Sequence, residues 1–249
     1  MRVLVTGTTL FFSSLLIQGF ARRGIQVTAA DNRSVSTGKL SRFTSRRVRV
    51  PSLAREPEAY LDAVLEELRR GQYDLLVPAF EESLLFAQHR ARLEEWTRVF
   101  LTPYAAMMSV HHKPMLYRQC DELGIPAPTS ASPRTSEDLD AAIPDLTFPV
   151  ILKLPAGNNS HGLTYAHTAT ELRTRFAKLA GEARRWGTNP PLVQNVIDGD
   201  PVYTLMFCDQ GRKLGEVIYR PLRTFPAKGG TSAHRIAVNH PLIAQYTAR

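Results

Sequence analysis

The chain has 249 residues, of which 43% are hydrophobic, and a formal net charge of +8. This length is enough for one large or two modest domains, each with its own core. It contains no apolar run of about eighteen residues and no secretion-signal pattern at its start, so we expect a soluble, cytoplasmic protein without a membrane partner.

The positive charge indicates either anionic partners or a generally basic surface. The densest basic stretch lacks the interleaved aromatic residues of single-strand platforms and any zinc-finger signature, so we interpret it as a solvated loop and expect no nucleic-acid partner. Its members are Arg42, Arg46, Arg47 and Arg49. The cysteines, Cys120 and Cys208, fit no metal-binding spacing and predict neither a disulfide framework nor a metal site.

Strand-like and helix-like patterns alternate over the first 103 residues, which predicts a doubly wound parallel sheet with helices on its faces. The patterns predict strands at 3–5, 25–30, 73–78 and 98–101, and helices at 10–20, 56–70 and 81–92.

Ligands of such sheets gather at the carboxyl ends of the strands, where Thr6-Gly7, Asp31 and Glu81-Glu82 are candidate rim residues. The dinucleotide fingerprint is absent because Gly7 is followed by Thr8-Thr9-Leu10, so we do not expect NAD. The alternative is that Gly7 forms a tight strand-to-helix turn and that Asp31 is a turn residue before Asn32.

The pattern of expected elements changes after Pro103. We expect helices from Lys113 to about Leu123, at 137–142 and at 170–183, strands at 148–153 and from 163, and a proline-fixed connector at 124–128. Beyond 191, a strand that ends at a predicted Asp198-Gly199 hairpin turn leads to strands at 202–208 and 214–220, joined by a turn at 209–211. The segment 241–249 resembles the start of an amphipathic helix.

Lys153 ends an apolar strand and is followed by a glycine-bounded polar loop, Gly157 to Gly162. A partly buried lysine needs an anionic partner, and backbone N–H groups in such a loop can approach phosphate oxygens. Lys113 considered alone is more typical of a solvated charge. Together these features indicate polyphosphate binding.

The order of Lys113, Lys153 with its loop, the segment 193–199 and Lys228-Gly229-Gly230-Thr231-Ser232 resembles the ATP-grasp superfamily, nearest its carboxylate–amine ligase and carbamoyl-phosphate-synthase-like branch. The resemblance implies an α/β chain in three parts. These are a pre-ATP-grasp domain (1–103), an ATP-grasp small lobe (104–195) and the start of a large lobe (196–249).

The resemblance also implies roles for individual residues. Lys113 and Lys153 would hold the α- and β-phosphates of ATP, and Arg220 would face the transferred phosphate. The loop that closes over the phosphates would be Gly157, Asn158, Asn159, Ser160, His161 and Gly162, although His161 is equally compatible with no chemical role. The hinge that holds adenine would be Gln194, Asn195, Val196 and Ile197, with Gly229-Gly230-Thr231 at the acceptor pocket.

Two positions depart from the family pattern. Pro201 stands where many members carry a ribose-binding glutamate, and Asp200 is the candidate substitute. The family's magnesium ligands, an acidic residue and a Glu-x-Asn pair, would lie well beyond Ser232, and no Glu-x-Asn occurs in this sequence. We therefore expect an incomplete large lobe and assign no metal ligand, although the resemblance implies ATP with magnesium.

The leading functional hypothesis is an ATP-dependent ligase that joins a small-molecule carboxylate to an amine or similar nucleophile through an acyl phosphate. A second hypothesis is a truncated or degenerate protein that binds ATP without catalysis, and a third is a basic interaction protein. Members of the superfamily often form dimers through the front domain, so a homodimer is one possibility.

Overall fold

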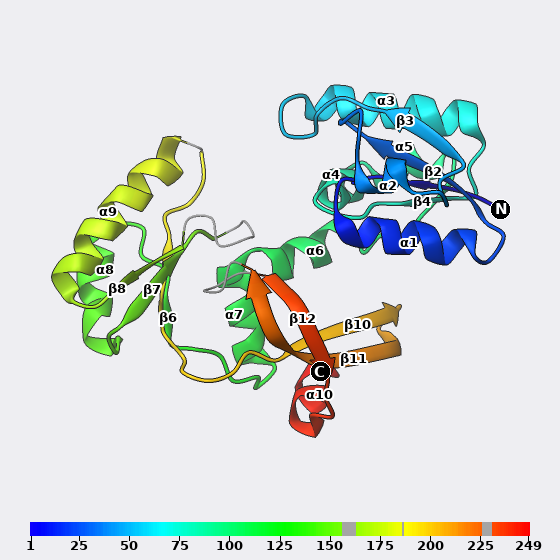
Figure 1. The fold of residues 1–249 in the computed structure, drawn as a ribbon. Helices are drawn as coiled ribbons and strands as arrows, with labels where there is room; N and C mark the ends of the chain where they lie inside the picture. The colour runs from blue at the N-terminus through cyan, green and yellow to red at the C-terminus, as the bar shows by residue number, and fades with distance from the viewer. Residues whose placement is uncertain (156–162, 186, 226–230) are drawn as a thin grey trace. The chain divides into compact units, whose positions relative to one another are not determined.

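The computed structural model describes residues 1–155, 163–185, 187–225 and 231–249 (Figure 1). It divides into two compact units, Met1–Met108 and Ser109–Arg249. The fold is mixed α/β, with one parallel sheet in the first unit and antiparallel sheets in the second, as the sequence predicted.

The first unit is built on a five-stranded parallel sheet with the order β3-β2-β1-β4-β5. Its strands are β1 (Arg2–Val5), β2 (Gln26–Asp31), β3 (Arg46–Arg49), β4 (Leu75–Val77) and β5 (Arg98–Val99). The chain winds outward from β1 to β2 and β3, then returns to β4 on the other side of β1. The boundary between the neighbouring strands β1 and β4 is therefore the topological switch point of the sheet.

Helices cover both faces of this sheet because side chains alternate along a buried strand. Leu4 packs into a core with Leu61 and Phe86, whereas its neighbours Val3 and Val5 pack with Ile17 on the opposite face. The helices are α1 (Phe11–Ala21), α2 (Thr37–Leu40), α3 (Pro57–Gly71), α4 (Glu82–Gln88) and α5 (Arg90–Glu94).

Two local predictions in this unit were wrong. The basic stretch is not a loop, because Arg46–Arg49 form β3 and pair with β2. Val48 is the only apolar residue of that strand, so the hydrophobic pattern gave no signal for it. The helix expected at 81–92 is two helices, because His89 leaves the helical region at φ −107° and ψ 24°.

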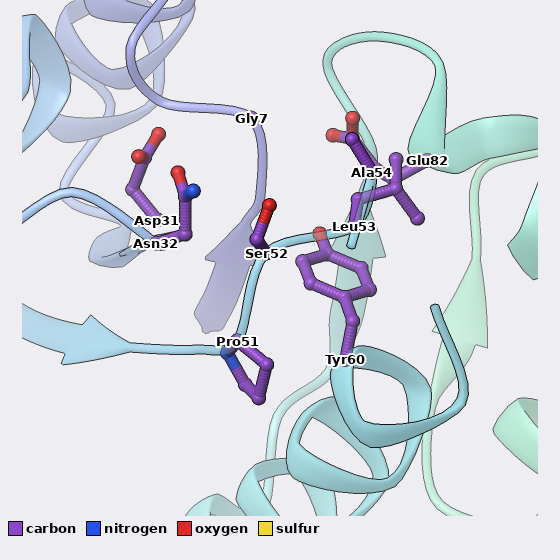
Figure 2. Close-up of a pocket in the computed structure, with 9 residues that line it drawn as sticks. All are labelled: Gly7, Asp31, Asn32, Pro51, Ser52, Leu53, Ala54, Tyr60 and Glu82. Carbon is purple, nitrogen blue, oxygen red and sulfur yellow. The ribbon is translucent and has the colours of Figure 1, made fainter. Parts of the chain in front are cut away.

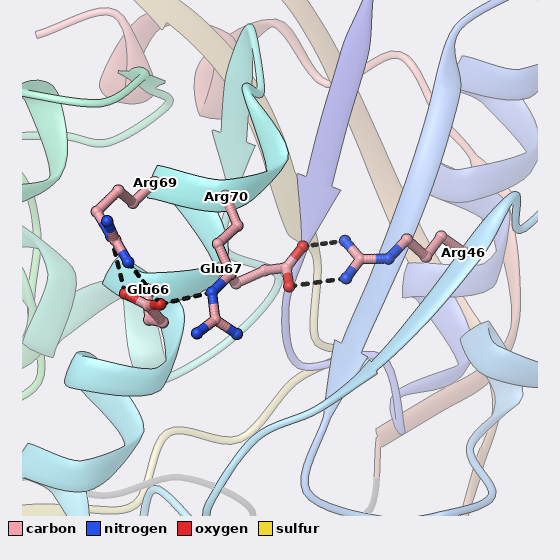
Figure 3. A network of polar contacts seen from close by, with 5 residues as sticks. All are labelled: Arg46, Glu66, Glu67, Arg69 and Arg70. Atoms are coloured by element: carbon pink, nitrogen blue, oxygen red, sulfur yellow. Dashed lines mark hydrogen bonds and ion pairs between the residues drawn. The ribbon is translucent and has the colours of Figure 1, made fainter.

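A buried carboxylate connects β3 to α3. Glu67 accepts hydrogen bonds from Arg46 and from the hydroxyl of Tyr73, 2.5 Å away, and Arg46 is held in a two-pronged ion pair (Figure 3). The hydrogen bond that Arg46 donates to the Glu67 carboxylate is the main reason that the pKa of Arg46 is raised. The arginine is therefore a structural part of this unit.

The second unit begins with an antiparallel sheet of order β6-β9-β7-β8. Its strands are β6 (Ser130–Ala131), β7 (Val150–Lys153), β8 (Leu163–Ala166) and β9 (Leu192–Asn195). One face is covered by α8 (Ser136–Ala142) and α9 (Ala169–Arg185), whose Leu139, Leu172 and Phe176 pack with Leu152 and Val193. A 3₁₀ helix, Ile143–Asp145, follows α8.

A separate three-stranded antiparallel sheet consists of β10 (Tyr203–Asp209), β11 (Arg212–Phe225) and β12 (Thr231–Ala237). The turn predicted at 209–211 is confirmed: Gln210 and Gly211, both with positive φ, connect β10 to β11. The Asp198-Gly199 hairpin was wrong, because β9 pairs with β6 and β7 whereas β10 pairs with β11. An Asp-Gly pair thus lies here in a connection between two sheets.

The remaining helices are α6 (Tyr104–His111), α7 (Lys113–Glu122) and α10 (Pro241–Thr247), the last being the terminal helix that the sequence predicted. Within the described ranges, no helix has the length and apolarity needed to cross a bilayer.

Candidate functional site

The face of the first sheet in unit 2 that lies opposite α8 and α9 carries polar residues that the strand alternation places there. Val150 and Leu152 of β7 point into the core with α8 and α9, so Ile151 and Lys153 point to the opposite face. Gln194 of β9 is the cross-strand partner of Ile151 and shares its face. An apolar strand therefore presents one lysine beside one glutamine.

Helix α7 adds two side chains to this face. Lys113 and Tyr117 are four residues apart and so lie on one side of the helix. The backbone N–H of Lys113 donates to the carbonyl of Pro155, 2.9 Å away, which ties the start of α7 to the segment that follows β7. Lys113 and Lys153 are thus brought into one site.

The carboxamide of Gln194 is the centre of this site. Its side chain is buried, with the residue 2% exposed, and its Oε1 accepts a 2.7 Å hydrogen bond from Lys153 Nζ. The same oxygen accepts a longer bond, 3.4 Å, from the Tyr117 hydroxyl, and Nε2 donates to Ser130 Oγ at 2.8 Å. Four elements, α7, β6, β7 and β9, therefore fix the position of the lysine.

The two ammonium groups affect each other. Burial lowers the pKa of Lys113, and burial together with the positive charge of Lys113 lowers the pKa of Lys153. Half-buried like charges are costly unless an anion lies between them or beside them. This face is therefore suited to a ligand with closely spaced negative charges.

The predicted hinge residues follow β9 directly. The Asn195 side chain accepts a bond from the Thr147 N–H, while Val196 and Ile197 lie beyond the strand and Ile197 is 68% exposed. Asp200 is exposed as well. The hinge that the resemblance implied is thus a polar anchor at Asn195 followed by two solvent-accessible apolar side chains.

Other predicted site residues are not joined to this cluster. Arg220 lies on β11 opposite Ile236, and among the described residues no hydrogen bond or ion pair links it to either lysine. The predicted phosphate loop, Gly157 to Gly162, lies outside the described residues, as do Lys228, Gly229 and Gly230.

Sequence reasoning missed the two hydroxyl groups that hold Gln194. Tyr117 could have been found, because it lies one helical turn after Lys113. Ser130 could not, because its contact depends on the pairing of β6 with β9 across 64 residues of chain.

A metal site is not formed by the described part of the chain. Nowhere in it do three histidine, cysteine, aspartate or glutamate side chains lie together in a way that could hold a metal ion. Within the described ranges, the two lysines have the charge that a phosphate group needs, but the side chains supply no magnesium site.

No protein-family model matches the sequence, and no curated protein matches it. Solved structures do match. An L-amino acid ligase from Bacillus licheniformis superposes with a TM-score of 0.71 at 19% identity, over 99% of this chain and 58% of that one.

Two further structures agree with this match. The biotin carboxylase domain of the Hydrogenobacter thermophilus 2-oxoglutarate carboxylase, in complex with MgADP, gives a TM-score of 0.70 at 16% identity, over 89% and 51% of the two chains. The ADP complex of an N5-carboxyaminoimidazole ribonucleotide synthetase gives 0.66 at 14% identity, over 99% and 60%. This chain spans little more than half the length of these proteins. Its fold is the ATP-grasp fold, as far as the chain extends.

Proposed function

We propose that this protein binds ATP on the face of β7 and β9 through Lys113 and Lys153, as part of an ATP-dependent ligase that joins a carboxylate to an amine. The observation that carries the proposal is the pair of half-buried lysines, of which Lys153 is held by Gln194. The fold supports it, since two of the structural neighbours are ADP complexes.

In the proposed reaction the γ-phosphoryl group passes from ATP to a carboxylate oxygen, which gives an acyl phosphate and ADP. The amine nitrogen then attacks the acyl carbon, an amide bond forms, and inorganic phosphate leaves. Lys113 and Lys153 neutralise phosphate charge and fix its position, and such placement is most of what phosphoryl transfer requires from a protein. Arg220 is the proposed contact to the transferred phosphate.

The hinge residues have proposed roles in the same complex. The exposed side chains of Val196 and Ile197 offer apolar surface for an adenine ring, next to the backbone of Asn195. Asp200 is the proposed contact to the ribose hydroxyls. Magnesium is expected from the family, but no step is assigned to it because the described residues form no site for it.

A second candidate function is ATP binding without turnover. The observation behind it is that the described residues form no metal site. The two functions differ in ADP release with pooled carboxylates and amines, which only the ligase should show.

Isothermal titration calorimetry with ATP tests the proposal. We expect Lys153→Ala to weaken ATP binding by about tenfold or more, because a hydrogen bond to a charged group contributes about 1.5–3 kcal/mol. Lys178→Ala is the matched control, since Lys178 is an exposed lysine of α9 in the same unit. Equal affinity of the wild type and Lys153→Ala would reject the assignment.

A further inference from the structure

The first unit contains a cavity of about 210 Å³ at the carboxyl ends of its parallel strands. Figure 2 shows Asp31 and Asn32 on one side, Tyr60 and Glu82 on the other, and Ser52 between them. Gly7 follows β1, and Glu82 follows β4 and begins α4, so the cavity lies at the topological switch point. This is the position at which open α/β sheets bind their ligands.

Gly7 brings the backbone after β1 close to the carboxylate of Glu82 at this cavity. It has a positive φ of 63°, and a Cβ at this position would lie 2.6 Å from Glu82 Oε1. Only glycine therefore allows the backbone after β1 to approach the carboxylate so closely. The Thr6 hydroxyl donates a 2.7 Å hydrogen bond to the same oxygen, which further fixes the position of the Glu82 side chain.

Glu82 is a buried carboxylate, only 4% exposed, whose two oxygens differ in their hydrogen bonds. Oε1 accepts bonds from the Thr6 hydroxyl and from the N–H groups of Ala79 and Phe80. Among the described residues no hydrogen bond reaches Oε2. Capping the turn at 79–80 accounts for Oε1, whereas Oε2 of this cavity-lining side chain has no hydrogen-bond partner among the described residues.

The opposite wall carries a second buried carboxylate, Asp31, which is 5% exposed. Its Oδ1 accepts hydrogen bonds from the Thr9 hydroxyl and the Arg33 N–H, both over 2.9 Å, and its Oδ2 accepts a longer one, 3.4 Å, from the Thr8 hydroxyl. The nearest buried cation, Lys39, donates to the carbonyl oxygens of Asp31 and Arg33. Neither Asp31 nor Glu82 forms an ion pair within the described ranges.

Tyr60 supplies a neutral polar group. Its residue is 5% exposed, and burial followed by the charge of Glu82 raises the pKa of its hydroxyl, so it remains protonated. The cavity thus combines two carboxylates, a phenol and the Ser52 hydroxyl, which together can accept several hydrogen bonds from one donor group.

We propose that this cavity binds a small ligand through a primary ammonium group, with Glu82 Oε2 and Asp31 as its anionic contacts. Two buried carboxylates that have no ion-pair partner among the described residues favour a cation and repel phosphate. The volume is below the range of about 300–1,000 Å³ that is typical of drug-sized ligands, so the cation is small. Its assignment as the amine substrate of the ligase rests on the proposed function, whereas binding itself does not.

The test is a calorimetric titration of the full chain without nucleotide. The probes are ethanolamine and putrescine, with ethylene glycol as the neutral match of ethanolamine and ribose as a diol probe. Glu82→Gln keeps the acceptor for Thr6, Ala79 and Phe80 but removes the charge. Glu81→Gln, the exposed neighbour that does not line the cavity, is the control.

We expect an amine probe to bind the wild type and Glu81→Gln equally and Glu82→Gln at least about tenfold more weakly, with ethylene glycol and ribose not binding. If Glu82→Gln fails to fold, judged by circular dichroism, Asp31→Asn replaces it with the same expectation. Amine affinity unchanged by the variant that folds, or preferential binding of ribose, overturns the proposal, as does the absence of amine binding.

The same experiment separates this inference from ATP binding. Lys153→Ala should lose ATP affinity and keep amine affinity, whereas Glu82→Gln should do the reverse. A wild type that binds ATP but none of the amine probes would reject the cavity assignment and leave the proposed ATP site standing.

Discussion

At the scale of single residues, Lys113 and Lys153 destabilise the folded chain, and an anionic ligand would lower that cost. The pKa of each lysine is lowered in the folded chain, so between that lowered value and 10.5 the unfolded chain binds more protons. The free energy of unfolding therefore rises with pH through this window.

This balance predicts the effect of removing one charge. Lys113→Gln should raise the pKa of Lys153 and stabilise the protein at neutral pH, because the repulsion between the two ammonium groups is lost. The gain over the wild type should shrink as the pH approaches 10.5, where the wild-type lysines lose their charge. Denaturant unfolding across this range measures the effect. A gain that does not change with pH would show that repulsion is not its cause.

A second prediction concerns Gln194. Gln194→Leu should lower the free energy of unfolding by about 1–3 kcal/mol, because it removes the hydrogen-bond partner of Lys153 Nζ and of Ser130 Oγ.

Gln194→Glu is the informative counterpart. It keeps an acceptor for Lys153 and should raise the pKa of that lysine, but its negative charge opposes phosphate. We expect a folded variant with weakened ATP binding. If ATP binds Gln194→Glu as tightly as it binds the wild type, the phosphates do not lie at this face.

Residue patterns predicted the positions of Lys113 and Lys153 but not what surrounds them. The lysine that interrupts an apolar strand was visible in the sequence, and so was the lysine at the start of a helix. The buried carboxamide of Gln194 was expected to serve a hinge, yet its side chain bonds to Lys153 and Ser130. That arrangement depends on strand pairing between distant segments, which no local pattern encodes.

At the scale of elements, the buried carboxylate of Glu67 adds a polar link between α3 and β3 to the apolar packing of that helix. Glu67→Ala should lower the free energy of unfolding by about 1–3 kcal/mol, because it leaves the Tyr73 hydroxyl and Arg46 without their acceptor. Among the described residues, its neighbour Glu66 pairs with Arg69 and Arg70 on the solvent side of the same helix (Figure 3).

Glu66→Ala is thus the matched control and should have a much smaller effect, since exposed ion pairs contribute little. Urea unfolding of the two variants measures the difference. Equal losses would mean that helix propensity, and not the network around Glu67, determines the cost.

Strongly periodic elements were the ones that the sequence could predict. β1, α3 and α9 were found because their apolar residues repeat at strand or helix spacing. β3 was missed because polar arginines dominate it, and its place in the sheet depends on pairing with β2. The Asp198-Gly199 pair was misinterpreted because turn residues also occur where a chain passes from one sheet to another.

At the scale of the whole molecule, each unit has its own core. Leu152→Ala removes a fully buried side chain from the core of unit 2 and should cost about 2–5 kcal/mol. Hydrogen exchange should show faster exchange in β7 and β9, with protection in β1 unchanged. Leu4→Ala should give the reverse pattern. Equal loss of protection in both units would mean that they unfold as one.

The central claim is that Lys113 and Lys153 hold the phosphates of ATP. Competitive acetylation of the lysines, read by mass spectrometry with and without ATP, tests it within one sample. We predict that ATP protects Lys113 and Lys153 while Lys178 and Lys213, both exposed, react equally in both conditions. Unchanged acetylation of Lys113 and Lys153 at a saturating ATP concentration would contradict the claim.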